Sequence, residues 1–533
     1  MNRFVLISIL LPACSMSPKK TDSSAHTSTE PASDEDTHDS STPDSDDSSE
    51  PIDSGDPPVI SECETGRNSA PLGDLTCMRQ APCVWGGTQN QGSRGYALDV
   101  GGDINGDGWP DMVVGAPTED IIVDDTIIGT DSGALHIWTN AGKAAESAPL
   151  ASLFGAVPGA YTGYSVAIVP DINGDGLDDI LAGGRGHNEL GVLAGGSVML
   201  LLGRTDGWET DTLTADRTWS GNTPYSRVGS HVRGTEDING DGLGDLLIAT
   251  HQKQLNSSEY ETTSSGRLAI IFGAASVDEL ATLDEPDADM IGSGLRDALG
   301  TAFATGDVDG DGHIDIIVGS PHGNSNAGRV DIIRGQSTPL SGTYTPELAH
   351  LNLSGSLGSS FGYTLAAGDL NGDGTAEIVI GAPTDDLQYD SSGSVSIYTG
   401  NTSLFEGVPS PSSQLHGEFD DHQLGLGIHA GSDLNGDGIG DLVVGAIFAW
   451  RGLITKGGRV YGFHGPHTDW STTINANSAP IQIFGAATKD YLGRANVAAD
   501  INSDGKAELF MGTGFSNGVS TYDSGNVAMF WGE

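Results

Sequence analysis

Seven short segments of this chain carry acidic side chains at the spacing that a calcium-binding loop requires. Each reads Asp-x-[Asn/Asp]-x-Asp-Gly-x-x-[Asp/Glu]. Calcium takes about six to eight oxygen ligands, and this spacing offers side-chain oxygens at positions 1, 3 and 5, a backbone carbonyl at position 7 and a closing carboxylate at position 9. The predicted ligands, loop by loop, are Asp103, Asn105, Asp107, Trp109 and Asp111; Asp171, Asn173, Asp175, Leu177 and Asp179; Asp237, Asn239, Asp241, Leu243 and Asp245; Asp307, Asp309, Asp311, His313 and Asp315; Asp369, Asn371, Asp373, Thr375 and Glu377; Asp433, Asn435, Asp437, Ile439 and Asp441; Asp500, Asn502, Asp504, Lys506 and Glu508.

Position 6 of every loop is glycine, which predicts a positive φ there, because glycine adopts that conformation at no steric cost. Up to seven structural Ca²⁺ ions are therefore expected. Magnesium is the alternative ion, although its rigid octahedron and retained waters suit a carboxylate-rich cage less well. The other alternative is a set of solvated Asp-Gly turns without metal. The loop Asp500–Glu508 is the weakest copy, because Ser503 replaces the usual glycine at position 4.

The seven loops recur every 62 to 70 residues, and such long-period similarity indicates a repeat fold. Short runs rich in Val and Ile, bounded by Gly, Pro, Asn and Asp, surround each loop and are typical of strands and turns. Each repeat contains four such runs. The sequence therefore predicts an all-β protein, a seven-bladed β-propeller of four-stranded blades.

The signature residues resemble the FG-GAP repeats of the integrin α-subunit β-propeller. Phe361-Gly362 precedes one loop and Gly381-Ala382-Pro383 follows it, while Gly115-Ala116-Pro117 repeats the second motif. The resemblance covers about residues 82–533. It implies the propeller fold and calcium, and it leaves the ligand open. Here every repeat carries a calcium loop, which resembles bacterial members of the family.

The last repeat ends after its third strand, so its fourth strand must come from another part of the chain. Residues 82–87, Pro82 to Gly87, precede the first loop in the way that Leu153-Phe154-Gly155 precedes the second. We therefore expect this N-terminal strand to complete the last blade and to close the ring, which removes exposed sheet edges.

The N-terminus resembles the signal peptide of a bacterial lipoprotein. Residues 1–13 are the expected signal, and Leu11-Pro12-Ala13-Cys14 resembles a lipobox with lipid on Cys14; an ordinary signal peptide is the alternative. Residues 14–62 are an acidic Ser/Asp/Pro-rich segment expected to be a disordered tether. Residues 63–81 form a cysteine-containing lead-in, and the pairing among Cys63, Cys77 and Cys83 stays open. An exported, lipid-anchored protein of a Gram-negative cell envelope is expected, at the outer membrane or cell surface.

The formal net charge of −50 argues against nucleic acid and anionic membranes as partners. Membrane attachment is expected only through the lipid anchor, and the protein is expected to be a monomer. A protein or polysaccharide ligand is expected on the face opposite the calcium loops, where loops of variable length carry aromatic and basic residues. The candidate ligand-binding residues are His251, Tyr260, Trp450 and Arg451.

No catalytic residues are predicted. The match of Gly358–Gly362 to a nucleophile elbow falls on a propeller turn, whereas an elbow needs a strand-to-helix turn. The sequence therefore favours a calcium-binding, surface-tethered, non-catalytic binding or adhesion module. The alternatives are a structural scaffold of an envelope complex and a polysaccharide hydrolase or lyase that uses paired carboxylates.

Overall fold

The computed structural model describes residues 83–86, 92–123, 126–139, 149–187, 191–208, 211–250, 265–294, 296–452, 454–466, 473–514 and 525–532. All of them belong to one of two compact units, Ile60–Glu533. The predicted signal peptide, lipidated Cys14, tether and lead-in lie outside the described residues, as do Cys63 and Cys77. None of the described helices is long and apolar enough to cross a membrane.

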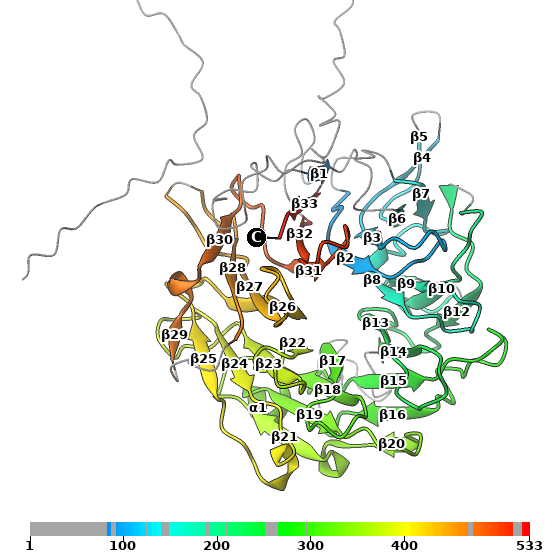
Figure 1. The fold of residues 1–533 in the computed structure, drawn as a ribbon. Helices are drawn as coiled ribbons and strands as arrows, with labels where there is room; N and C mark the ends of the chain where they lie inside the picture. The colour runs from blue at the N-terminus through cyan, green and yellow to red at the C-terminus, as the bar shows by residue number, and fades with distance from the viewer. Residues whose placement is uncertain are drawn as a thin grey trace, which may run out of the picture. The chain divides into compact units, whose positions relative to one another are not determined.

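Seven antiparallel blades are arranged in a ring, so the predicted seven-bladed propeller is confirmed (Figure 1). The first strand of each blade lies at the centre. These strands are β2 (Ala97–Gly101), β8 (Thr162–Val169), β13 (Val232–Thr235), β17 (Ala302–Gly306), β22 (Thr364–Gly368), β26 (Leu424–Ser432) and β31 (Ala495–Ala499). The second strands are β3 (Asp111–Ala116), β9 (Asp179–Gly184), β14 (Asp245–Thr250), β18 (Asp315–Ser320), β23 (Glu377–Ala382), β27 (Asp441–Ala446) and β32 (Glu508–Thr513).

The third strands are β6 (Ala134–Trp138), β10 (Ser197–Leu201), β15 (Arg267–Ile271), β19 (Arg329–Ile333), β24 (Ser394–Tyr398), β28 (Arg459–Phe463) and β33 (Asn526–Phe530). The outer strands are β7 (Ala151–Phe154), β12 (Arg217–Ser220), β16 (Ala288–Ile291), β21 (Leu351–Ser354), β25 (Ser413–His416), β30 (Ile481–Phe484) and β1 (Cys83–Gly86). Every residue of the second strands is buried. These strands therefore read as continuous apolar runs rather than alternating ones, because both of their faces pack against neighbouring blades.

Several shorter strands and helical turns lie outside the four main strands of the blades. The short strands β11 (Asp211–Thr212), β20 (Gly342–Tyr344) and β29 (Ile474–Asn475) pair in parallel with β7, β16 and β25, and each comes from the following blade. They cover outer edges that would otherwise present unpaired backbone groups. The strands β4 (Ile121–Val123) and β5 (Thr126–Gly129) form a hairpin between β3 and β6. The short helical turns are α1 (Gly323–Asn326), η3 (Pro346–Leu348), η4 (Leu404–Glu406) and η6 (Ala476–Ser478).

The strand β1 closes the ring, as the sequence predicts. It pairs antiparallel with β33, with Cys83 opposite Met529 and Gly86 opposite Asn526. Trp85 is buried, and its ring lies 6.2 Å from the ring of Phe510 in the same blade. Burial of a tryptophan side chain contributes strongly to stability. The first and last parts of the propeller are thus joined in one sheet.

Seven hydrophobic clusters fill the ring, one between each pair of neighbouring blades.

The FG and GAP motifs meet at these junctions. A Cβ atom on Gly115 would lie 2.0 Å from the carbonyl oxygen of Gly163, the glycine that opens the next blade. In the same way, a Cβ atom on Gly319 would lie 2.1 Å from the carbonyl oxygen of Gly362. Both motifs therefore keep glycine because two backbones approach closely. At the junction of the third and fourth blades, Ala249 takes this place.

Candidate metal centres

The seven acidic loops join the first and second strands of the blades, and we number them one to seven in chain order. In every loop, position 9 is the first residue of the second strand, such as Asp111 in β3 and Glu508 in β32. The strand therefore fixes one end of the loop. The glycines at position 6 have φ between 82° and 90°, as predicted, so a larger residue there would be strained.

The carboxylate at position 1 organises the loop backbone. In loop one, Oδ1 of Asp103 accepts hydrogen bonds from the amides of Gly106 (2.7 Å) and Asp107 (3.1 Å), and its Oδ2 accepts from Gly108 (2.8 Å). The same bonds recur around Asp171, Asp237, Asp307, Asp369 and Asp433. Loop seven keeps only two of the three, to Asp504 and Gly505. Position 4 of this loop is Ser503, whose amide forms no such bond among the described residues.

The carboxylate at position 9 is buried below each loop. The two oxygens of Asp179 accept from the amides of Ile172 (2.8 Å) and Gly203 (2.9 Å), which ties the loop to the end of the third strand. Burial, with a smaller contribution from the loop's other carboxylates, raises the pKa of Asp179, Asp245, Asp315 and Glu377 to about 7. It raises the pKa of Glu508 to about 8. A bound cation would favour the ionised form of these acids.

The donor set fits calcium. Each loop presents side-chain oxygens on alternate residues of a tight turn, and hard cations prefer such oxygen ligands. In loop four, carboxylate oxygens of Asp307, Asp309 and Asp315 lie within 4.8 Å of one another. In the other loops position 3 is asparagine, whose amide oxygen is also a suitable ligand. The chemistry of a bound ion would be to hold the loop by neutralising its clustered carboxylates.

Loop four differs from the others in the charge of its predicted ligands. It is the loop with aspartate at position 3, and among the described residues it is also the loop whose side chains form ion pairs with an arginine. The guanidinium of Arg334 lies 2.5 Å from an oxygen of Asp309 and 2.9 Å from an oxygen of Asp311. Arg334 therefore offsets the extra carboxylate of this loop, and it lies where it competes with a cation for Asp309.

Neighbouring loops are hydrogen-bonded to one another. The amide at position 8 of a loop donates to the carbonyl of position 1 in the preceding loop at five junctions: Asp178 to Asp103 (3.1 Å), Gly244 to Asp171 (3.2 Å), Ala376 to Asp307 (2.9 Å), Gly440 to Asp369 (3.1 Å) and Ala507 to Asp433 (2.6 Å). Side chains at position 7 pack beside the same junctions. A Cβ on Gly106 would lie 2.9 Å from Leu177, and one on Gly310 would lie 2.8 Å from Thr375.

Two junctions break this chain of bonds. At the junction of loops seven and one, position 8 is Pro110, which has no amide proton. Between loops three and four, no bond from Ile314 to Asp237 is present among the described residues. The loops therefore form two arcs, loops one to three and loops four to seven.

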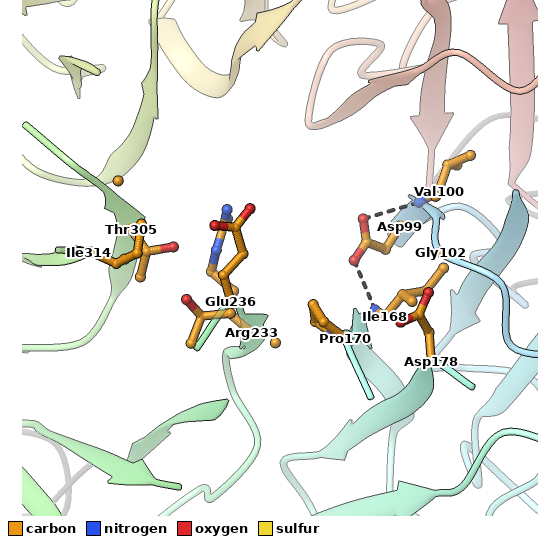
Figure 2. Close-up of a pocket in the computed structure, with 14 residues that line it drawn as sticks. Asp99, Val100, Gly102, Ile168, Pro170, Asp178, Arg233, Glu236, Thr305 and Ile314 are labelled. Atoms are coloured by element: carbon orange, nitrogen blue, oxygen red, sulfur yellow. Dashed lines mark hydrogen bonds between the residues drawn. The ribbon is translucent and has the colours of Figure 1, made fainter. Parts of the chain in front are cut away.

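The central strands enclose a channel made of two adjoining parts, with volumes of about 500 Å³ and about 360 Å³. Both parts are lined by Asp99 and Arg233. Figure 2 shows Arg233 and Glu236 at the end of β13, with Asp99 across the space on β2. Asp99 accepts from the amides of Val100 (3.0 Å) and Ile168 (2.9 Å), so it links the first two blades, and burial raises its pKa. Asp99 is thus already bonded to the backbone, and Asp178 and Glu236 also line the smaller part of the channel.

The candidate ligand-binding residues have different outcomes. His251 and Tyr260 lie outside the described residues. Trp450, between β27 and β28, is 48% exposed, whereas the guanidinium of Arg451 lies 4.3 Å from the centre of the Phe484 ring. Trp450 also contacts the rings of Phe419 and His422, which sequence reasoning missed. Those two residues lie between β25 and β26, in the connection from one blade to the next.

The Gly358–Gly362 match lies in the turn before β22, as expected, and not in a strand-to-helix turn. The hydroxyl of Ser360 accepts a hydrogen bond from Thr384 at 2.8 Å. The match therefore lies in a propeller turn between β21 and β22.

Comparison with known proteins identifies FG-GAP repeats at residues 94–138, 299–333 and 361–398. The chain is 32% identical to integrin alpha-PS2 of Drosophila melanogaster over 180 residues, which are 31% of this chain and 12% of that protein. It is 33% identical to integrin alpha-7 of Rattus norvegicus over 168 residues, 30% of this chain and 14% of that protein. Phosphatidylinositol-glycan-specific phospholipase D of Homo sapiens is 32% identical over 206 residues, 37% of this chain and 24% of that protein.

The chain therefore spans between about an eighth and a quarter of the length of these relatives. Among solved structures, the exotype rhamnogalacturonan lyase YesX aligns with a TM-score of 0.36 at 14% identity, covering 81% of this chain and 72% of that one. The Dos1 propeller aligns with a TM-score of 0.37 at 12% identity, covering 79% and 74%. The repeats and the propeller agree with the resemblance read from the sequence.

Proposed function

We propose that this chain, a seven-bladed propeller with FG-GAP repeats, is a calcium-stabilised binding module that performs no catalysis. The observation that carries the proposal is the sevenfold repetition of one oxygen-rich loop, with a buried carboxylate at position 9 in each copy. Such loops hold cations that stabilise a scaffold, and the scaffold then presents variable loops on its other face.

The ligand is a protein or a polysaccharide, bound on the face opposite the calcium loops. The similarity to integrin α-subunits supports a binding role over an enzymatic one. The lipobox-like Cys14 and the acidic segment 14–62 support an exported protein held by a lipid at the outer membrane or cell surface, in an adhesion-like role.

Thermal melting of the full-length protein, in calcium and in chelator, tests the calcium part of the proposal. A ligand that binds only the folded state stabilises it by mass action, so the melting temperature should fall markedly when calcium is removed. An unchanged melt in chelator would exclude structural calcium. Screening a panel of glycans and envelope proteins for binding in the presence of calcium tests the binding role. Metabolic labelling of the parent protein and of Cys14→Ser with a fatty-acid analogue tests the lipid anchor.

A further inference from the structure

An exposed aromatic surface lies between the fifth and sixth blades. It consists of Phe419, His422 and Trp450, which we call the aromatic patch. The ring centres of Phe419 and Trp450 are 5.3 Å apart, and the planes are inclined by 37°. Their side chains are 47% and 48% exposed. Large exposed aromatic side chains that contact one another mark interaction sites more often than isolated apolar residues do.

His422 supports the two exposed rings from below. It is 1% exposed and lies edge-on to both, with ring centres 5.1 Å from Phe419 and 5.9 Å from Trp450. Neither of its ring nitrogens has a hydrogen-bond partner among the described residues. Burial lowers its pKa, so this ring is neutral at physiological pH. A neutral imidazole leaves the patch without a positive charge of its own.

Four exposed carboxylates lie on the β23–β24 and β25–β26 connections, the second of which carries Phe419 and His422: Asp386, Asp390, Asp420 and Asp421. None of them is in an ion pair within the part of the chain that the structure describes. No lysine or arginine occurs between Pro383 and Leu424. The nearby Arg459 is already paired with the buried Glu418, at 2.6 Å. Two basic side chains of the Trp450 loop, Arg451 and Lys456, lie over the rings of Phe484 and Phe448. The four aspartates therefore outnumber them, and the rim is negatively charged overall.

The rim is also held in a fixed shape. The amide of Asp390 donates to a carboxylate oxygen of Asp420 (3.1 Å), and the amide of Asp421 donates to the carbonyl of Asp390 (2.8 Å). These bonds join the loop that follows β23 to the loop that follows β25. A surface that is already ordered loses less conformational entropy when a partner binds.

We propose that the aromatic patch binds a cationic segment of a partner protein, with an arginine or lysine side chain over Trp450 and Phe419 and its charge among the four aspartates. Aromatic faces attract cations, and a carboxylate rim adds charge complementarity and guides encounter. The proposal rests on the binding role proposed above, and it names both the surface and the class of partner.

Binding of a fluorescein-labelled ten-residue arginine-rich peptide to the full-length protein tests this inference, at physiological salt and saturating calcium. Trp450→Ala and Phe419→Ala should each weaken binding by tenfold or more, as expected for aromatic residues at the centre of an interface. Asp420→Asn with Asp421→Asn should weaken it by a similar factor and should reduce its salt dependence. All variants should melt at the temperature of the parent protein.

Two matched variants serve as controls. Asp278→Asn with Glu279→Gln removes the same charge from an exposed site before β16, and Leu357→Ala removes an exposed apolar side chain elsewhere. Neither control should change affinity more than about twofold. Equal losses in control and patch variants would reveal unspecific attraction to an acidic protein and would overturn the proposal.

The outcomes separate this inference from the proposed function. Binding of a panel ligand that survives all patch variants would overturn the patch and leave the binding role intact. Binding of a neutral oligosaccharide that Trp450→Ala abolishes, without binding of the basic peptide, would assign the patch to saccharides instead. No saturable binding to any panel member or peptide would count against both proposals.

Discussion

The backbone amide of Asp178 donates a hydrogen bond of 3.1 Å to the carbonyl oxygen of Asp103, and so joins loop two directly to loop one. Ordering of either loop by a cation therefore restrains the other. Pro110 has no amide proton, and no such bond joins the third and fourth loops in the described part of the chain. This coupling is therefore confined to two arcs.

We expect calcium binding to be cooperative within an arc and independent between arcs. Asp171→Ala, which removes position 1 of loop two, should weaken calcium binding at loops one and three and leave loops four to seven unchanged. Asp433→Ala, which removes position 1 of loop six, is the matched change in the other arc. Calorimetric titration of the full-length protein gives the number of sites in each affinity class. Loss of a single site, with no change at its neighbours, would contradict the coupling.

A second prediction concerns the strained position in loop seven. Ser503 has φ of 59°, a region that costs a non-glycine residue about 1–2 kcal/mol. Ser503→Gly should therefore stabilise the protein by about 0.5–1 kcal/mol, after the greater chain entropy of glycine is subtracted. Gly240→Ser is the mirror control, because φ there is 84° and a Cβ would meet no atom. It should destabilise by a similar amount. Equal denaturation midpoints for Ser503→Gly and the parent would show that the turn is unstrained.

A third prediction follows from the contact of Arg334 with Asp309. Arg334→Gln removes the positive charge that offsets the fourth carboxylate of loop four, so it should lower the stability of the calcium-free protein. The guanidinium is 42% exposed, and solvent screening limits this effect to about 0.5 kcal/mol. The same variant should bind calcium more tightly at loop four, since a competitor is gone.

The double variant Arg334→Gln with Asp309→Asn converts loop four into the charge pattern of its neighbours. It should recover the calcium-free stability of the parent. A double-mutant cycle of melts in chelator measures the coupling between the two side chains. Additive effects of the two single changes would show that they do not interact.

A fourth prediction concerns pH. In the calcium-free protein the pKa of Asp179 and Glu377 is about 7, above the usual range for carboxyl groups. A raised pKa means that the folded state binds the proton more tightly than the unfolded state. The stability from these protons is complete below pH 4 and is lost as the pH rises through 7. Melting temperatures in chelator should therefore fall between pH 6 and pH 8, and the gain on adding calcium should grow. A calcium gain that is constant across this range would contradict the assignment.

The sequence predicted most of the ring, because its signals are local and repeated. Each loop fixes a strand on both sides, and seven copies fix the number of blades. The closing strand at Trp85 was predictable from counting strands. The contact between Phe419 and Trp450 was not predictable, because Phe419 follows β25 in the connection between two blades and Trp450 lies between β27 and β28. The contact of Arg334 with Asp309 was also not predictable from the sequence. The spacing of residues along the chain does not show that the end of β19 lies beside loop four.

The FG-GAP glycines yield the last prediction. Gly115→Ala would place a methyl group 2.0 Å from the carbonyl oxygen of Gly163, so the first two blades would have to move apart. Overpacking of this kind costs about 1–3 kcal/mol. The third blade offers a natural control, since Ala249 already occupies the equivalent position. Ala249→Gly should cost only about 0.5–1 kcal/mol, from greater chain entropy. Chemical denaturation of both variants in calcium compares the two costs. If Gly115→Ala were no more harmful than Ala249→Gly, the motif would owe its glycine to something other than the close approach of neighbouring blades.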